Sequence, residues 1–215
     1  MLPQLLSVFL QSRCPFCART SSEYICQYCL AKLLQCQMKE RDRRHWWGEM
    51  PVFAWGKYEG QLKRAIALMK YNNHPEIGII LGQLLARAWS ASDFAKFKEI
   101  SVVPIPLHRH KMKERGFNQA EKVARGFCQL TGYDLSTQTL IRVKETKAMF
   151  DLNPEERTKN LQGAFRLNKK LPRHPVLLLD DIYTKGTTVN ESAKILRRNK
   201  VNVIGSVVIA KTSKF

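Results

Sequence analysis

The chain has 215 residues, which is long enough for one α/β domain with a small appendage and a sizeable buried core. Lys and Arg number 36 against 18 Asp and Glu, which gives a formal net charge of +18. This excess argues against an enzyme whose only ligands are neutral small molecules, and it favours nucleic acid or a multiply phosphorylated ligand as partner. Solvated surface lysines are the alternative that the charge alone leaves open.

Residues 1–10 are partly apolar, but the sequence predicts neither a membrane span nor a signal peptide there. A span needs roughly 20 apolar residues, and no stretch of the chain approaches that length. A signal peptide begins with a basic region and ends at a cleavage site, whereas this segment lacks basic residues and runs into a cysteine motif. We therefore expect a cytoplasmic protein with reduced cysteines.

Two Cys-x-x-Cys pairs follow, Cys14 with Cys17 and Cys26 with Cys29. A gap of two residues lets both thiolates of a turn point at one ion, and two such turns complete a tetrahedral site. This spacing predicts a structural zinc site that stands in for a hydrophobic core in a short segment. An iron centre of the rubredoxin type is the chemical alternative. A disulfide framework does not suit the expected compartment, and a redox pair does not explain two adjacent motifs.

The segment 30–44 is basic and predicts a linker or a short helix, and Trp46 and Trp47 follow it. Adjacent tryptophans can stack on bases. More often such a pair packs a small module against its neighbour, and we favour that interpretation. We therefore expect a zinc-binding module at 1–50 and a larger domain at 51–215.

Apolar patterns predict a strand, two helices and a second strand at 52–58, 62–71, 77–89 and 101–106. The helix at 77–89 is apolar nearly all round, so we expect it to be buried. The strand at 101–106 contains Pro104 and Pro106, which confine the stretch to a sheet edge or to the end of its strand.

Leu107, His108 and Arg109 open a basic loop after this strand. Open α/β sheets bind ligands in the loops at the carboxyl ends of their parallel strands. The loop continues through Arg-Gly-Phe-Asn-Gln-Ala at 115–120 into a helix that reaches about residue 130. A strand is predicted at 140–143, and the polar segment 144–165 then forms a long exposed loop of the kind that is usually functional.

The most informative stretch is Val-Leu-Leu-Leu-Asp-Asp-Ile-Tyr-Thr-Lys-Gly-Thr-Thr at 176–188. Its apolar start predicts a short central parallel strand that is covered on both faces. Two carboxylates follow at the strand's end, where they can accept hydrogen bonds from a ribose diol. The hydroxyl-rich turn and the helix at 189–198 behind it can bind a phosphate. A last strand is expected at 201–209. The run at 176–188 is not a Walker A loop, because it lacks the pattern Gly-x-x-x-x-Gly-Lys-[Ser/Thr]. The alternative is an ordinary strand–turn–helix in which the acid pair merely caps the helix.

The Asp-Asp-x-x-Thr-x-Gly-Thr-Thr run resembles the 5-phosphoribosyl-1-pyrophosphate (PRPP) loop of type I phosphoribosyltransferases. Pro-Ile-Pro-Leu-His at 104–108 and Arg-Gly-Phe-Asn-Gln-Ala at 115–120 are similar to the signature of ComF-type late-competence proteins, which place a four-cysteine module before a PRPP-type domain. The resemblance covers nearly the whole chain. It implies the type I phosphoribosyltransferase fold, a parallel sheet flanked by helices, behind an N-terminal zinc finger.

The resemblance also implies a role for each motif. The PRPP-binding residues would be Asp180, Asp181, Thr184, Lys185, Gly186, Thr187 and Thr188, and the pyrophosphate loop would be Leu107, His108 and Arg109. Mg²⁺ would arrive with PRPP, because substrate phosphates supply the hard oxygen ligands that it prefers. The loop at 144–165 would cover the site, and Met149 stands where the family commonly has Gln.

The basic loops predict contacts with the phosphates of single-stranded DNA, through Lys111, Lys113, Arg115, Arg142, Lys144 and Lys147. No residue identifies an acceptor site or a catalytic group, and fold alone does not give function. Three functions therefore stay open: a DNA-uptake factor of natural transformation, a phosphoribosyltransferase on an unidentified acceptor, and a zinc-dependent adaptor. We favour the first combined with the third, with a ComFA-type competence helicase as the partner that the resemblance implies.

Overall fold

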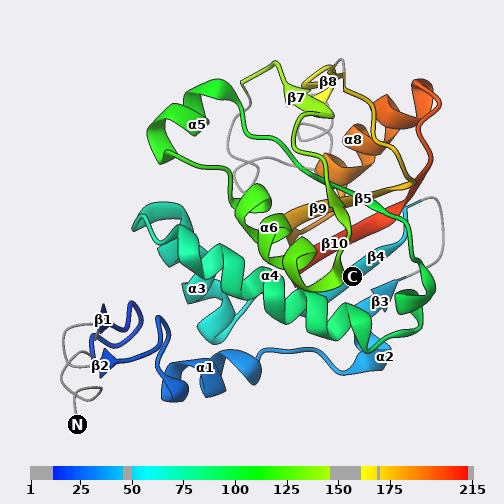
Figure 1. Ribbon diagram of the computed structural model, residues 1–215. Helices are drawn as coiled ribbons and strands as arrows, with labels where there is room; N and C mark the ends of the chain where they lie inside the picture. Colours follow the sequence, from blue (N-terminus) through cyan, green and yellow to red (C-terminus); the bar gives the residue numbers. More distant parts are fainter. Residues whose placement is uncertain (1–11, 46–49, 146–160, 169, 213–215) are drawn as a thin grey trace, which may run out of the picture.

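The structure, a computed structural model, describes residues 12–45, 50–145, 161–168 and 170–212 (Figure 1). The predictions for Trp46, Trp47, Lys147 and Met149 fall outside these ranges, as does most of the loop predicted at 144–165. None of the helices in the described ranges has both the length and the apolar character that crossing a membrane would need.

A six-stranded sheet forms the centre of the molecule. Its strands, in spatial order, are β3 (Arg44–His45), β4 (Val52–Lys57), β10 (Val203–Lys211), β9 (Val176–Tyr183), β5 (Ser101–Pro104) and β6 (Asp134–Leu135). All neighbours from β4 to β6 pair in parallel, and β3 is added antiparallel at one edge. This confirms the predicted α/β class with a parallel sheet.

Helices cover both faces of this sheet (Figure 1). The larger described helices are α3 (Gly60–Tyr71), α4 (Pro75–Ser90), α6 (Gln119–Thr131) and α8 (Thr187–Arg198). Along β9, Leu177 and Leu179 pack into the core under α3, α4 and α6, whereas Val176 and Leu178 pack into the core under α8. Successive side chains of a strand point to opposite faces. The apolar run therefore marks a strand buried on both sides, as predicted.

The helices α4 and α6 pack against each other through glycines. A Cβ on Gly82 would meet the backbone oxygen of Val123, and a Cβ on Gly126 would meet that of Ile79, both closer than atoms can approach. The two helix backbones are therefore in direct contact, which only glycine permits at these positions. The predicted burial of the helix at 77–89 is confirmed, since Ile77, Leu81, Leu85 and Trp89 are inaccessible to solvent.

Two predicted elements differ from the structure, and a third, found as predicted, lies apart from the central sheet. The strand at 176 extends to Tyr183, so the two aspartates lie inside β9 and not after its end. The basic loop after β5 contains a short helix, α5 (Arg109–Arg115). Gly116, with φ 76°, ends that helix before α6 begins. The strand at 140 lies outside the central sheet: β7 (Leu140–Arg142) pairs antiparallel with β8 (Phe165–Leu167). Pro104 is the last residue of β5, as its missing N–H requires.

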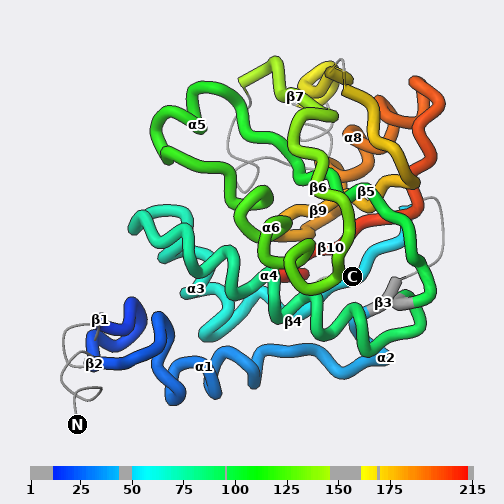
Figure 2. Tube along the Cα trace, in the orientation of Figure 1, coloured from blue at the N-terminus to red at the C-terminus, as the bar shows by residue number. Residues whose placement is uncertain are grey.

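The cysteine module packs directly on the main domain. It consists of the hairpin β1 (Ser12–Arg13) and β2 (Thr20–Ser21), α1 (Gln27–Leu34) and α2 (Glu40–Arg43). Phe16 and Leu33 belong to the same buried cluster as Leu62 and Ile66 of α3. Figure 2 shows the trace leaving the module at one end of the molecule and ending with β10 inside the sheet.

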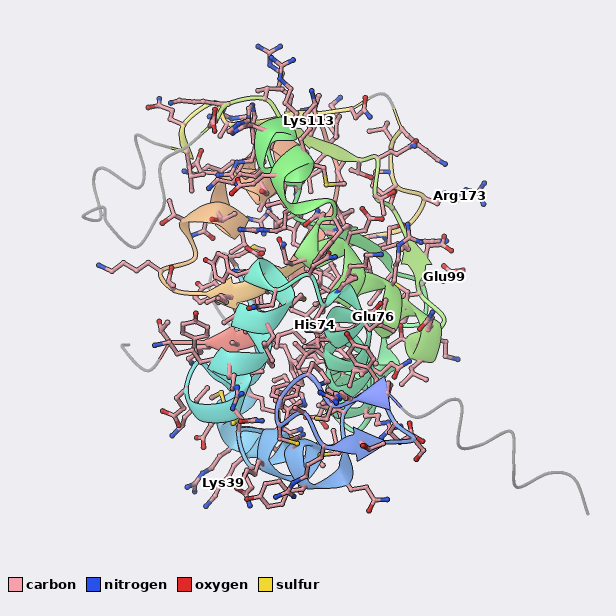
Figure 3. All side chains as sticks on the ribbon, turned by 90° about the vertical axis from the view of Figure 1, so that its left-hand side faces the viewer. Lys39, His74, Glu76, Glu99, Lys113 and Arg173 are labelled. Atoms are coloured by element: carbon pink, nitrogen blue, oxygen red, sulfur yellow. The ribbon has the colours of Figure 1, made fainter. Side chains whose placement is uncertain are left out.

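Hydrogen bonds fix the same contact. The hydroxyl of Tyr24 lies 2.7 Å from Nδ1 of His74 and donates to Oε2 of Glu76 at 2.9 Å, and Arg64 Nη2 donates to the carbonyl oxygen of Phe16 at 2.6 Å. His74 and Glu76 lie beside the module in Figure 3. The predicted boundary at residue 50 therefore separates two parts that share one core, and their independence remains a prediction.

Candidate functional site

A cavity of about 500 Å³ opens at the carboxyl ends of β5 and β9. These strands are neighbours, but their crossover connections go opposite ways. After β5 the chain passes through α6 to the edge strand β6, and after β9 it passes through α8 to β10. Such a topological switch point leaves a gap between the two connections, and open α/β sheets bind their ligands there.

The acidic pair of β9 lines this cavity. Asp180 and Asp181 are consecutive strand residues, so their side chains point to opposite faces of the sheet. Asp181 meets Lys70 of α3 at 2.6 Å between Nζ and Oδ2. Desolvation and the charge of Asp181 raise the pKa of Asp180 to about 7, and Lys70 and Arg142 oppose that rise. Burial beside a second carboxylate thus favours the protonated form of Asp180.

Lys70 is a site residue that the sequence analysis missed. Burial alone would lower the pKa of its ammonium group, but the charge and hydrogen bond of Asp181, together with the charges of Asp180 and Tyr58, outweigh burial and raise it. Both side chains are largely shielded, with 19% of Lys70 and 13% of Asp181 exposed. A signal was present: Lys70 follows Ile66 by four residues, so it lies on the buried face of its helix.

The turn after β9 has the geometry expected of a phosphate loop. Gly186 adopts φ 72° and precedes the first turn of α8. A Cβ at this position would collide with the ring of Tyr183, so the turn requires glycine. Thr184, Gly186, Thr187 and Thr188 line the cavity, whereas Lys185 is exposed and lies outside its lining. The N–H groups of a first helical turn have no partners within the helix and can bind an anion.

Three cationic side chains also line the cavity: Lys111 and Arg115 from α5, and Arg142 from β7. Desolvation, together with the charges of Arg142 and Arg115, lowers the pKa of Lys111. Like charges held this close favour an anion between them. Of the residues predicted to bind DNA, these three thus lie inside the cavity, and Lys113 and Lys144 lie on the exposed surface.

The predicted pyrophosphate loop is only partly in the cavity. Leu107 lines it. His108 precedes α5, where its Nδ1 accepts a hydrogen bond from the N–H of His110 at 3.4 Å, and Arg109 is exposed. Because the segment is helical, the side chain that reaches the cavity comes from Lys111, two residues later.

The Arg-Gly-Phe-Asn-Gln-Ala motif connects α5 to α6 and forms part of the cavity lining. Asn118 caps α6 through its Oδ1, which accepts from the N–H of Ala120, and its Nδ2 donates to the carbonyl oxygen of Ile105 at 2.9 Å. Arg115 Nη1 donates to Oε1 of Gln119 at 2.9 Å. Arg115, Asn118 and Gln119 all line the cavity. The motif therefore ties the end of β5 to the start of α6.

The four predicted metal ligands converge. The sulfur atoms of Cys14, Cys17, Cys26 and Cys29 all lie within 4.8 Å of one another. The N–H of Cys26 donates to Sγ of Cys14, as expected where a sulfur is to be a thiolate. This arrangement is compatible with a structural metal site. Cys128, which is not part of this cluster, packs against the main hydrophobic core, and burial raises its pKa to about 12.

No protein-family model matches the chain. It is 29% identical over 198 residues to "Competence protein F" of Haemophilus influenzae, covering 88% of this chain and 82% of that protein. It is 27% identical over 187 residues to "Competence protein ComFC" of Streptococcus pneumoniae, covering 86% and 74%. A third match, 28% over 144 residues, is to "DNA utilization protein YhgH" of Salmonella typhimurium and covers 66% of this chain and 63% of that protein. These relatives support the ComF-type resemblance.

Proposed function

We propose that this chain is a DNA-uptake factor of natural transformation that binds PRPP in the cavity and contacts single-stranded DNA and a competence helicase. One observation supports the ligand assignment above others. A single cavity of about 500 Å³ is lined by an acidic pair, a glycine turn before a helix N-terminus, and three cations. A sugar with phosphates at both ends needs these three environments together. The names of the relatives support the role in DNA uptake.

Each environment has a separate task in this proposal. The N–H groups and hydroxyls of the 184–188 turn bind the 5′-phosphate, and the dipole of α8 adds a favourable charge. Asp180 and Asp181 accept hydrogen bonds from the ribose diol. Lys111, Arg115 and Arg142 bind the diphosphate. Lys70 balances the charge of Asp181 through their contact of 2.6 Å.

Mg²⁺ fits the same donor set. It prefers hard oxygen ligands and binds through one or two carboxylates together with substrate phosphates. Asp180 and Asp181 present such oxygens in the cavity. The ion would neutralise part of the charge of the diphosphate, and the three cations that line the cavity would neutralise more of it.

Calorimetric titration of PRPP with Mg²⁺ tests the ligand assignment, with Asp181→Asn as the variant. We expect weaker PRPP binding without unfolding, because the variant loses a charged acceptor for the diol. Asp134→Asn is the matched control, since Asp134 is an exposed carboxylate on β6, outside the cavity lining. An unchanged affinity in Asp181→Asn would refute the site assignment.

The cluster of three cations also favours a second candidate, an active phosphoribosyltransferase on an unidentified acceptor. Positive charge at the leaving pyrophosphate would stabilise the transition state of such a transfer. Pyrophosphate release, measured during the same titration with DNA or small acceptors added, separates the two functions. Release that depends on Lys111 and Arg142 would establish the enzyme, and binding without release would leave PRPP as a retained or regulatory ligand.

A further inference from the structure

We propose that the metal site of the cysteine module and the cavity are coupled through α3, so that a ligand bound at either site raises the affinity of the other. The inference rests on the proposed PRPP site and deepens it by naming its regulation. The affinity of the cavity for a sugar phosphate would depend on whether the module holds a metal ion. Three contacts between the module and the main domain carry the argument.

The first contact joins the metal-binding turn to α3. Phe16 lies between Cys14 and Cys17, and its carbonyl oxygen accepts a hydrogen bond from Nη2 of Arg64 at 2.6 Å. The Phe16 side chain is buried in the same cluster as Ile66 of α3. A turn of two residues between two thiolates takes its conformation from the ion that both thiolates bind. The direction of the Phe16 carbonyl, and with it the bond to Arg64, therefore depends on the ion.

The other two contacts hold the module at both ends of α3. Before the helix, the N–H of Lys57 in β4 donates to the carbonyl oxygen of Cys36 at 3.2 Å. A Cβ on Gly56 would lie 2.7 Å from that same oxygen, so the chain of the module lies directly against the strand. After the helix, the hydroxyl of Tyr24 lies 2.7 Å from Nδ1 of His74. Because the module is held on both sides, a change in the metal-binding turn acts on α3 instead of moving the module away.

The same helix lines the cavity. Ile66 belongs both to the core shared with the module and to the cavity lining. Lys70 also lines the cavity, and its Nζ lies 2.6 Å from Oδ2 of Asp181. Arg64 precedes Lys70 by six residues, which is about 9 Å along a helix. One helix thus connects the metal-binding turn with the carboxylate where the ribose diol is placed.

The coupling arises because both ligands favour the same position of α3. A metal ion fixes the turn and, through Arg64, the position of the helix. A sugar phosphate whose diol binds Asp181 needs Lys70 and the lining residues in that position. By linkage, the two affinities then rise by the same factor. Without the ion the turn loses its constraint, because a short four-cysteine segment depends on its metal for folding. Arg64 is a positioning residue, since it lies outside the cavity lining.

Competition with a chromogenic chelator tests the coupling by measuring the affinity of the protein for zinc, with and without PRPP and Mg²⁺. We expect PRPP to raise the zinc affinity about fivefold, which is at the lower end of the usual range of coupling between two sites. Linkage requires zinc to raise the affinity for PRPP by the same factor. Calorimetric titration of the zinc-loaded and the zinc-free protein measures this second ratio.

The variant Arg64→Met removes the hydrogen bond and keeps an apolar side chain in its place. It should reduce the effect of PRPP on zinc affinity to a factor near 1. The readout is the ratio of zinc affinities with and without PRPP, which a purely structural loss would not change. Lys63→Met is the matched control, because Lys63 is the exposed neighbour on the same helix, and it should keep the fivefold effect. An equal effect of PRPP in the parent and in Arg64→Met, as global unfolding on zinc removal would give, would overturn the proposal.

Two further outcomes separate the coupling from the proposed function. If PRPP binds but leaves the zinc affinity unchanged, the coupling is refuted and the proposed PRPP site stands. If PRPP does not bind, the proposed function fails, and amide hydrogen exchange decides the coupling. Removal of zinc should then increase exchange at 66–71, the cavity end of α3, in the parent and in Lys63→Met, with no further increase in Arg64→Met. An increase confined to 12–45, or one that is equal in all three proteins, would refute the coupling.

Discussion

At the scale of single residues, the contact between Lys70 and Asp181 joins two shielded opposite charges in the lining of the cavity. We expect Lys70→Met to lower the free energy of unfolding by about 3 kcal/mol, the usual order for removing one partner of a buried ion pair. The loss arises because Asp181 remains shielded without a counter-charge. Urea unfolding measures it, and Lys63→Met, an exposed position on the same helix, is the control. Equal stability of the two variants would contradict the prediction.

Asp180 makes the stability of the folded protein fall as the pH rises. Its folded-state pKa of about 7 lies above the ordinary value of 3.8, so the folded chain binds a proton more tightly than the unfolded chain does. The stabilisation is complete below about pH 4 and is lost as the pH rises through 7.

The variant Asp180→Asn resembles the protonated side chain and does not titrate. We therefore expect its stability relative to the parent to increase between pH 5 and pH 8, as measured by urea midpoints at each pH. Titrating groups that do not interact with Asp180 are common to both proteins and cancel in this comparison. A difference that stays constant across the pH range would show that Asp180 titrates normally.

At the scale of elements, the close packing of α4 on α6 has a direct consequence. We expect Gly126→Ala to destabilise the protein by about 1–3 kcal/mol, as overpacked cores commonly are. Alanine favours a helix by about 1 kcal/mol over glycine, but the new Cβ would meet the backbone of Ile79. Thermal unfolding measures the effect. Arg125→Ala, at the neighbouring exposed position, should cost much less, and equal losses would contradict the packing argument.

The elements also show what the sequence could and could not predict. The apolar run at 176–179 was enough to predict a strand buried on both faces. Successive side chains point to opposite faces of a sheet, so an uninterrupted apolar run places apolar side chains on both faces. The full length of β9 was not predicted, because Asp180 and Asp181 are poor strand formers in isolation. They remain in the strand because β10 pairs with it as far as Tyr183.

The short helix α5 was missed for a similar reason. Most of its residues are basic and none is buried, so no apolar face marks a helix and the sequence was consistent with a loop. That helix decides which basic side chains enter the cavity. The pyrophosphate loop was predicted at Leu107, His108 and Arg109. Of these, Leu107 lines the cavity and Arg109 is exposed, and the basic side chain that lines the cavity is that of Lys111. The contact of Lys70 with Asp181 joins residues more than one hundred positions apart, and local patterns contain no information about such a pair.

At the scale of the whole molecule, the cysteine module and the main domain share a hydrophobic core. We expect a chelator to release one metal ion and to increase amide hydrogen exchange in 12–45, because metal binding and folding are coupled in four-cysteine sites. Exchange should also increase in α3 near Arg64, which donates to the carbonyl of Phe16. Increased exchange confined to 12–45 would show instead that the module unfolds independently, and global unfolding would show one cooperative unit.

The distribution of positive charge leads to a prediction about DNA. Lys113 lies on α5, beside Lys111 and Arg115 of the cavity, whereas Lys39 lies at the opposite end of the molecule, by the cysteine module (Figure 3). If single-stranded DNA crosses the mouth of the cavity, Lys113 contacts a phosphate and releases a counterion. We expect Lys113→Ala to weaken DNA binding and to reduce the slope of log affinity against log salt by about 0.7, the value for one phosphate of a single strand.

Lys39→Ala removes the same charge and should leave that slope unchanged. Fluorescence anisotropy with a labelled oligonucleotide at several salt concentrations measures both variants. Equal effects would mean that the net charge of +18 attracts DNA without a defined path, whereas a selective effect of Lys113 would locate the strand beside the cavity.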